Sequence, residues 1–218
     1  MTRFATFDCY GTLVDWDAGI RSELERLIPG VPGEELLERY HELEPEVEED
    51  YRSYREVLAL VLGQIAEEHG SEIPVEKRDA LAGSLPGWPV FPEVRDALAE
   101  ARRRGFKVCI LSNTDRDLVA ASREAIGVPF DLAIVAEDVG SYKPAHGHWQ
   151  RFFAETGSDR ARHVHVGASL FHDIAPAREL GLVTIWVNRL GEVPGPVPDR
   201  EIPDLTMLPD VLDELVPE

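Results

Sequence analysis

The sequence of 218 residues predicts an α/β fold with a parallel, doubly wound sheet. Short apolar runs alternate with helical patterns along most of the chain, and this alternation is typical of a parallel sheet. Residues 15–90 interrupt it with one helical pattern after another and no convincing strand. The simplest account is a helical insertion between the first and second strands, which would cover the carboxyl edge of the sheet as a lid.

The expected elements follow the chain in order. Buried parallel strands are predicted by the apolar runs at residues 3–8, 106–112, 132–136, 163–167 and 183–187. Helices are predicted by apolar spacing at residues 93–104, 116–126, 145–156 and 173–180. The Pro- and Gly-rich tail, 191–206, is expected to be a surface loop. These patterns divide the chain into a core domain, 1–14 and 91–218, and a helical cap domain, 15–90.

Composition narrows the function classes. The net charge of −19 argues against nucleic acid or an anionic membrane as a partner, because both require a basic surface. The sequence contains neither a signal-peptide pattern nor an apolar stretch long enough to cross a bilayer. Cys9 and Cys109 are too few for a disulfide framework, so we expect a reducing, cytoplasmic setting. An anionic substrate would need a local positive site on this acidic protein.

Polar side chains follow four of the predicted strands. Asp8 follows the first, Ser112 and Asn113 the second, Lys143 the third, and Ser169 and Asp173 the fourth. Ligands of open α/β sheets bind at this carboxyl edge, so the group is a candidate site for covalent catalysis. The alternative for Asp8 is a simple turn-capping role, since Gly11 follows it closely.

Four motifs in this order resemble those of the haloacid dehalogenase superfamily: Phe7–Leu13, Leu111–Asn113, Tyr142–Pro144 and Val166–Asp173. The resemblance covers nearly the whole chain. It implies a Rossmann-like core with a helical cap inserted after the first strand, and Asp8 as nucleophile.

Two departures separate the chain from the phosphatases of that superfamily. Tyr10 stands where they usually have an acid/base Asp, and a phenol is a poor acid/base near neutral pH. Ala168 stands where they have a carboxylate ligand of Mg²⁺. The chain therefore resembles the L-2-haloacid dehalogenase branch (type II), which needs no metal. The implied activity is hydrolysis of small 2-haloalkanoic acids through an aspartyl ester, with no cofactor. A Mg²⁺-dependent phosphatase and a non-catalytic binding member of the fold remain as alternatives.

The resemblance also implies roles for the other motif residues. Lys143 would pair with Asp8 and keep it ionised. Ser112 and Asn113 would donate hydrogen bonds to the substrate carboxylate or to Asp8, and Asp173 would orient or activate the hydrolytic water. A helix-capping role for Ser112 and Asn113, or an N-terminal helix position for Asp173, would also fit the pattern.

Expected substrate-binding residues are Tyr10, Thr12, Arg39, Ser169 and Trp149. Arg39 matches weakly the cap arginine that faces the active site in the family, and a solvated helix-face arginine is the alternative. The fourth motif has one residue more than usual between Ser169 and Asp173, and Trp149 stands where the family often has Tyr. These changes leave the substrate open.

Two further expectations concern partners. Five histidines could form a transition-metal site, although their spacing is not diagnostic and no Cys joins them: His146, His148, His163, His165 and His172. The resemblance also implies that a homodimer is possible.

Overall fold

A computed structural model describes residues 2–193, 195 and 197–218. Six parallel strands form one sheet in the order β3-β2-β1-β4-β5-β6, which confirms the predicted α/β class. The strands are β1 (Arg3–Phe7), β2 (Phe106–Ser112), β3 (Leu132–Val135), β4 (His163–Gly167), β5 (Val183–Val187) and β6 (Arg200–Ile202). The chain therefore places β1, β2 and β4 side by side, and their carboxyl ends meet at one edge.

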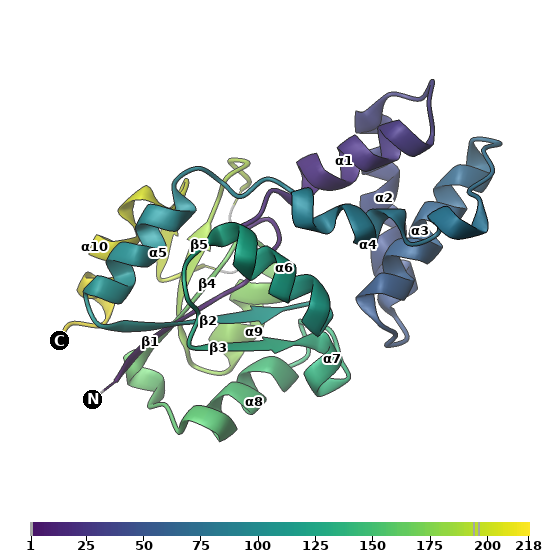
Figure 1. The fold of residues 1–218 in the computed structure, drawn as a ribbon. Coiled ribbons are helices and arrows are strands. Elements are labelled where there is room, and N and C mark those ends of the chain that lie inside the picture. Colours follow the sequence, from purple (N-terminus) through teal and green to yellow (C-terminus); the bar gives the residue numbers. More distant parts are fainter. Residues whose placement is uncertain (1, 194, 196) are drawn as a thin grey trace.

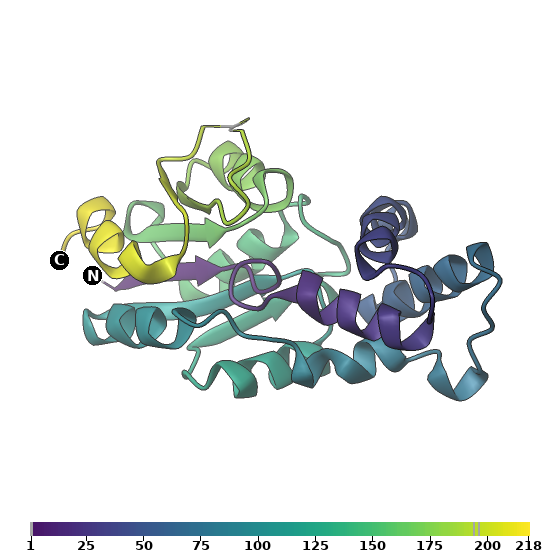
Figure 2. The same ribbon diagram turned by 90° about the horizontal axis from the view of Figure 1, so that it is seen from above.

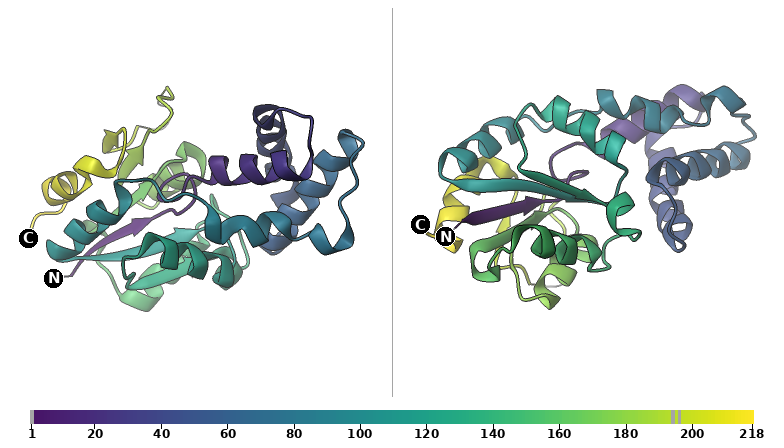
Figure 3. Two further views of the ribbon diagram at one scale, coloured as in Figure 1. Left: turned by 45° about the horizontal axis from the view of Figure 1, so that its top comes forward. Right: turned by 60° about the horizontal axis from the view of Figure 1, so that its bottom comes forward.

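Helices cover both faces of the sheet. Those around the sheet are α5 (Val94–Arg103), α6 (Arg116–Ile126), α7 (Ala136–Val139), α8 (Gly147–Thr156), α9 (Ala175–Glu179) and α10 (Leu208–Leu215). In Figure 3, α5, α6 and α10 lie on one face and α8 and α9 on the other. Both sides of the sheet are thus shielded from water, which agrees with the continuous apolar runs of its strands.

A group of helices stands apart from the sheet, beyond its carboxyl edge (Figures 1 and 2). It consists of α1 (Trp16–Leu27), α2 (Gly33–Glu48), α3 (Tyr54–Glu68) and α4 (Ala80–Ser84). The two connections to the sheet run side by side, because Val14 and Val90 form an antiparallel bridge. Asp15 N–H donates to Pro89 O at 2.8 Å, and Phe91 N–H donates to Leu13 O at 3.1 Å. We refer to α1–α4 as the cap helices.

Asp115, at the carboxyl end of β2, ties the cap helices to the sheet. Its carboxylate accepts hydrogen bonds at 2.9 Å from the backbone N–H groups of Tyr54 and Arg55, in the first turn of α3. Helix N-termini carry unpaired N–H groups and a partial positive charge, so a buried carboxylate there is stabilised. Ser53 and Glu56 complete the cap of α3 by a reciprocal capping box.

The predicted surface loop over 191–206 is wrong in part. Residues 200–202 form β6, which pairs with β5 at the sheet edge, and Asp199 accepts hydrogen bonds from the backbone N–H and hydroxyl of Thr184. The strand escaped prediction because it is only three residues long and two of them, Arg200 and Glu201, are charged and exposed. Residues 194 and 196 of that tail lie outside the described residues.

No helix in the described part of the chain has both the length and the apolar character needed to cross a membrane.

Candidate active site

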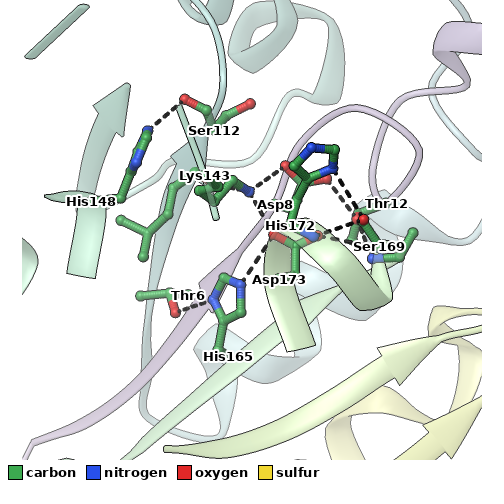
Figure 4. Close-up of polar contacts among 12 residues, drawn as sticks. Thr6, Asp8, Thr12, Ser112, Lys143, His148, His165, Ser169, His172 and Asp173 are labelled. Atoms are coloured by element: carbon green, nitrogen blue, oxygen red, sulfur yellow. Dashed lines mark hydrogen bonds and ion pairs between the residues drawn. The ribbon is translucent and has the colours of Figure 1, made fainter. Parts of the chain in front are cut away.

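Lys143 lies at the centre of the site, with its ammonium group between two carboxylates (Figure 4). Its Nζ donates to Asp8 Oδ1 at 2.9 Å, to Asp173 Oδ1 at 2.6 Å and to Leu111 O at 2.9 Å. An ammonium group has three N–H donors, so all three are used. Burial would lower the pKa of Lys143, but the charges of Asp173 and Asp8 raise it above the ordinary value. The side chain is therefore held as a cation.

Asn113 positions Lys143 through its backbone. The Asn113 Nδ2 group donates to Lys143 O at 3.0 Å, and Asn113 Oδ1 accepts from Lys143 N–H at 2.6 Å. This two-point clamp joins the end of β2 to the loop before α8. The clamp uses the amide oxygen and one of the two N–H groups of Nδ2, and Asn113 also lines the cavity, so the expected hydrogen bond to Asp8 or a substrate stays a prediction.

Asp8 directly follows β1 and is 8% exposed. Its Oδ1 accepts from Lys143, and its Oδ2 accepts from the hydroxyl of Thr12 at 2.9 Å. Burial raises the pKa of Asp8 to about 6; the charge of Asp173 adds to the rise, while Lys143 and Thr12 oppose it. Gly11 makes the turn after Asp8 with a φ of +84°, a conformation that favours glycine. The turn brings Thr12 back to the carboxylate.

Asp173 reaches the same ammonium from the other side, on a π-helical turn, Leu170–Ile174. Such a turn takes up one extra residue, and Ile174 N–H bonds to Ser169 O across it at 3.2 Å. This accounts for the additional residue of the fourth motif: the inserted position is absorbed in the turn, and Asp173 still meets Lys143. Burial would raise the pKa of Asp173, but Lys143 and the N–H of His165 hold it well below its ordinary value.

Ser112, Ser169 and Tyr10 border the same cavity. The Ser112 hydroxyl is fully buried and has no hydrogen-bond partner in the described part of the chain. Ser169 exchanges hydrogen bonds with His172, receiving one from its backbone N–H at 3.0 Å. The Tyr10 hydroxyl lies 3.1 Å from Ser122 Oγ, and burial raises the pKa of this phenol well above its ordinary value. Tyr10 is therefore a neutral wall of the cavity.

Three predicted substrate-binding residues do not line the cavity: Thr12, which is fully buried and donates to Asp8, Arg39 and Trp149. Arg39 is not among the residues lining the cavity; at a solvent-exposed position it pairs with Glu68 and Glu42, both at 2.7 Å. Trp149 is fully buried under the sheet, with its ring 5.0 Å from that of His165. Neither Arg39 nor Trp149 therefore reaches the cavity in this structure, which for Arg39 favours the alternative of a solvated helix-face arginine. Arg39 lies one residue before the inward-facing Tyr40, about 100° around the helix.

The cavity has a volume of about 770 Å³ and is lined by residues of both the sheet edge and the cap helices. Sequence reasoning missed its cap wall, which holds His41, Glu44 and Glu48 of α2. Glu44 accepts hydrogen bonds from the hydroxyls of Tyr40 and Tyr54 at 2.8 and 2.9 Å. Burial and the neighbouring Glu44 raise the pKa of Glu48 to about 8.

Sequence reasoning also missed Arg189 as a residue of the cavity. It follows β5, lines the cavity and donates to Thr12 O at 2.8 Å and to Glu93 at 2.7 Å. The cavity thus contains more acidic than basic groups.

The donor set does not fit the magnesium site of a phosphatase. Lys143 already bonds one oxygen of each of the two buried carboxylates, Asp8 and Asp173, and Ala168 offers no side-chain oxygen beside them. No group of three or more His, Cys, Asp or Glu side chains suited to a metal occurs within the described residues, and this includes the histidines considered above. Mg²⁺ depends on several oxygen ligands, most of them carboxylates or water.

Comparison with known proteins agrees with the fold and identifies the family. The family model of haloacid dehalogenase-like hydrolases matches residues 2–181. An (S)-2-haloacid dehalogenase of Pseudomonas sp. (strain YL) is 28% identical over 95% of this chain and 93% of its own length. A phosphatase of Mycobacterium tuberculosis is also 28% identical, over 95% of both chains.

Solved structures extend the likeness in fold. The L-2-haloacid dehalogenase of Xanthobacter autotrophicus, with chloropropionic acid covalently bound, superimposes with a TM-score of 0.86 over 97% of this chain and 98% of that one, at 22% identity. The match of residues 2–181 to the family model identifies the protein as a hydrolase. The chain belongs to the haloacid dehalogenase-like hydrolase family.

Proposed function

We propose that the protein is a hydrolytic dehalogenase of small 2-haloalkanoic acids that works through an ester on Asp8. The observation that carries the proposal is the contact of Lys143 Nζ with both Asp8 and Asp173, in a cavity whose donor set does not suit Mg²⁺. The similarity to the (S)-2-haloacid dehalogenase over nearly the full length of both chains supports it. We also propose a cytoplasmic enzyme that needs no metal or organic cofactor.

In the first step, one oxygen of Asp8 attacks the carbon that bears the halogen. The new C–O bond forms as the C–X bond breaks, and both electrons leave with the halide. Attack at carbon needs no proton donor when the leaving group is a stable anion, so a neutral Tyr10 beside Asp8 is compatible with it. Lys143 orients Asp8, and Thr12 holds its second oxygen.

In the second step, water adds to the carboxyl carbon of Asp8, and the bond from this carbon to the Asp8 oxygen that had attacked the substrate breaks. One proton goes to that oxygen, giving a 2-hydroxy acid, and one is released when Asp8 ionises again. We propose that Asp173 orients this water, and that the Ser112 hydroxyl, which has no partner among the described residues, donates to the substrate carboxylate. The regenerated Asp8 keeps an oxygen atom from the water.

The cap helices complete the cavity in this proposal. We propose that residues 15–90 form a cap domain on a core of 1–14 and 91–218, with a hinge where residues 13–15 pair with 89–91. Aromatic side chains on the cap side, including Trp16 and Tyr54, offer an apolar surface for a carbon–halogen group.

The alternative is a Mg²⁺-dependent phosphatase, because the similar M. tuberculosis protein is a phosphatase. The deciding experiment measures halide release from 2-chloropropionate and phosphate release from an aryl phosphate in parallel, with and without a chelator. We expect chelator-insensitive halide release, abolished in Asp8→Asn and retained in Asp117→Asn, a surface aspartate paired with Arg55. Single turnover in isotope-labelled water should place the label in Asp8. Magnesium-dependent phosphate release without halide release would refute the proposal.

A further inference from the structure

A chain of buried polar groups continues from Asp173 into the sheet, beneath the site (Figure 4). His165 Nε2 lies 3.4 Å from Asp173 Oδ1, and His165 Nδ1 lies 2.9 Å from Thr6 Oγ1. Thr6 Oγ1 also lies 2.7 Å from His163 Nε2. Thr6, His163 and His165 are all fully buried, on the neighbouring strands β1 and β4. The proposed reaction gives these three side chains no direct contact with substrate.

The position of each proton in this chain can be worked out from Asp173. The carboxylate is ionised and can only accept, so His165 Nε2 must carry the hydrogen. His165 Nδ1 is then an acceptor, and the single hydroxyl hydrogen of Thr6 is directed to it at 2.9 Å rather than to the more distant Val164 O at 3.4 Å. Thr6 Oγ1 in turn accepts from His163 Nε2. An apolar residue at His165 would remove the donor to Asp173, and valine at Thr6 would remove the hydroxyl that contacts His165 Nδ1.

His163 supports this direction. Its Nδ1 is buried and has no partner in the described part of the chain. With Nε2 as the donor, Nδ1 is a bare acceptor; the reverse direction would leave a buried N–H unsatisfied. Burial lowers the pKa of His163 to about 3 and also lowers that of His165, so both rings are neutral. Each ring is therefore restricted to its Nε2–H tautomer.

We propose that His165 is a positioning residue for Asp173, and that Thr6 holds it in the tautomer that donates to the carboxylate. The Nε2–H group and Lys143 fix Asp173 Oδ1 from two directions, and the backbone N–H of Ser169 holds Oδ2 at 3.2 Å. The inference deepens the proposed function, on which its kinetic consequence rests. Asp8 has its own contacts with Lys143 and Thr12, so loss of His165 affects hydrolysis of the ester more than its formation.

The kinetic test compares three variants. His165→Met keeps a buried side chain of similar size and removes the donor, while His165→Gln retains an N–H near the position of Nε2. His163→Met is the matched control, because His163 is equally buried on the same strand and also contacts Thr6. Rapid quenching with 2-chloropropionate measures the formation and the decay of the ester separately.

We expect ester hydrolysis to slow about 10- to 100-fold in His165→Met, the usual range for loss of an outer hydrogen bond to a ligand-holding group. Ester formation should change less than threefold, so the ester accumulates, and His165→Gln should recover most of the hydrolysis rate. His163→Met should lower the thermal midpoint similarly without accumulation of the ester. Equal slowing of both steps in His165→Met, or accumulation in His163→Met, would overturn the proposal.

A second measurement does not depend on turnover. Nitrogen NMR of the ¹⁵N-labelled wild type should show His165 as the neutral Nε2–H tautomer from about pH 7 to about pH 9, because burial lowers the pKa of this ring below its ordinary value. Thr6→Val should leave the ring neutral but no longer restricted to that tautomer. An Nδ1–H ring in the wild type, or a ring that titrates in this range, would refute the positioning role. If the wild type releases no halide, the proposed function fails while this test still decides the inference.

Discussion

Acidification is the most direct test of the nucleophile. The reaction requires ionised Asp8, whose pKa is raised to about 6 from an ordinary 3.8, because burial and the charge of Asp173 outweigh the opposing effect of Lys143. At about pH 5 such a group is about one-tenth ionised, whereas a group with the ordinary pKa would be more than nine-tenths ionised. We therefore expect kcat/KM for halide release to fall about tenfold between neutral pH and about pH 5.

The assay follows initial halide release from 2-chloropropionate at several pH values, with circular dichroism at each pH to confirm that the protein is folded. The substrate is already ionised throughout this range, so the acid limb reports the free enzyme. Thr12→Val removes a donor to Asp8 Oδ2, which should raise the pKa further and move the limb to higher pH. A flat wild-type profile down to about pH 5, or a Thr12→Val limb at lower pH, would refute the reasoning.

The same shift affects stability. A carboxyl whose pKa is higher in the folded than in the unfolded state binds its proton more tightly when folded. Its contribution to the free energy of unfolding therefore falls as the pH rises from about 4 to about 6 and stays at the lower value above that range.

Three further substitutions test charged side chains, two in the cavity and one outside it. Lys143→Met removes the ammonium from two buried carboxylates and should lower the free energy of unfolding by about 3–5 kcal/mol near neutral pH. The loss should be smaller at about pH 5, where Asp8 is protonated; urea titrations at both pH values measure it, and an equal loss would contradict the pairing. Glu44→Gln removes a negative charge from the cavity wall and should lower KM for an anionic substrate by about fivefold, equivalent to about 1 kcal/mol. Its control is Glu42→Gln, on the same helix but outside the cavity, and equal effects of the two would contradict the placement. Arg39→Ala should leave kinetics and halide inhibition unchanged, since Arg39 pairs outside the cavity; a raised KM would restore a substrate role.

The sheet could be predicted because its strands are buried on both faces and read as apolar runs. β1, β2 and β4 lie within one or two residues of the predicted runs. β6 could not be predicted in this way, because an edge strand of three residues needs few apolar side chains and is held by hydrogen bonds to β5 and around Asp199. The short helix α7 was missed for a similar reason, since four residues do not define a helical period.

For the motif residues of the site, the sequence could predict only that they lie together at one edge of the sheet. Asp8, Lys143 and Asp173 were expected there, and the structure brings them together. The hydrogen bonds were not predictable: the clamp by Asn113 depends on the path of the loop before α8, and the π-helical turn before Asp173 has no sequence pattern of its own.

One residue of the cavity wall on the cap helices could have been predicted from helical spacing. Tyr40 belongs to the apolar stripe of α2, and Glu44 lies four residues later on the same helix face. A stripe that faces the sheet edge thus carries Glu44 toward the cavity and places Arg39 to one side. Helical spacing would have favoured Glu44 over Arg39 as a residue lining the cavity, although it could not show which stripe of the helix faces the site.

The charge balance of the buried centre favours ester formation. At neutral pH Asp8 and Asp173 are ionised and share one ammonium, so the resting centre of three buried side chains carries one net negative charge. Conversion of Asp8 to an ester removes that charge and leaves Lys143 and Asp173 as a balanced pair. The pKa values diverge accordingly, since that of Asp8 is raised and that of Asp173 is lowered. Environments that separate two carboxylates in this way usually assign them different roles. Asp8, whose ionised form is the less stabilised, is the one suited to attack carbon, and Asp173, ionised throughout, is suited to hold water and lysine in place.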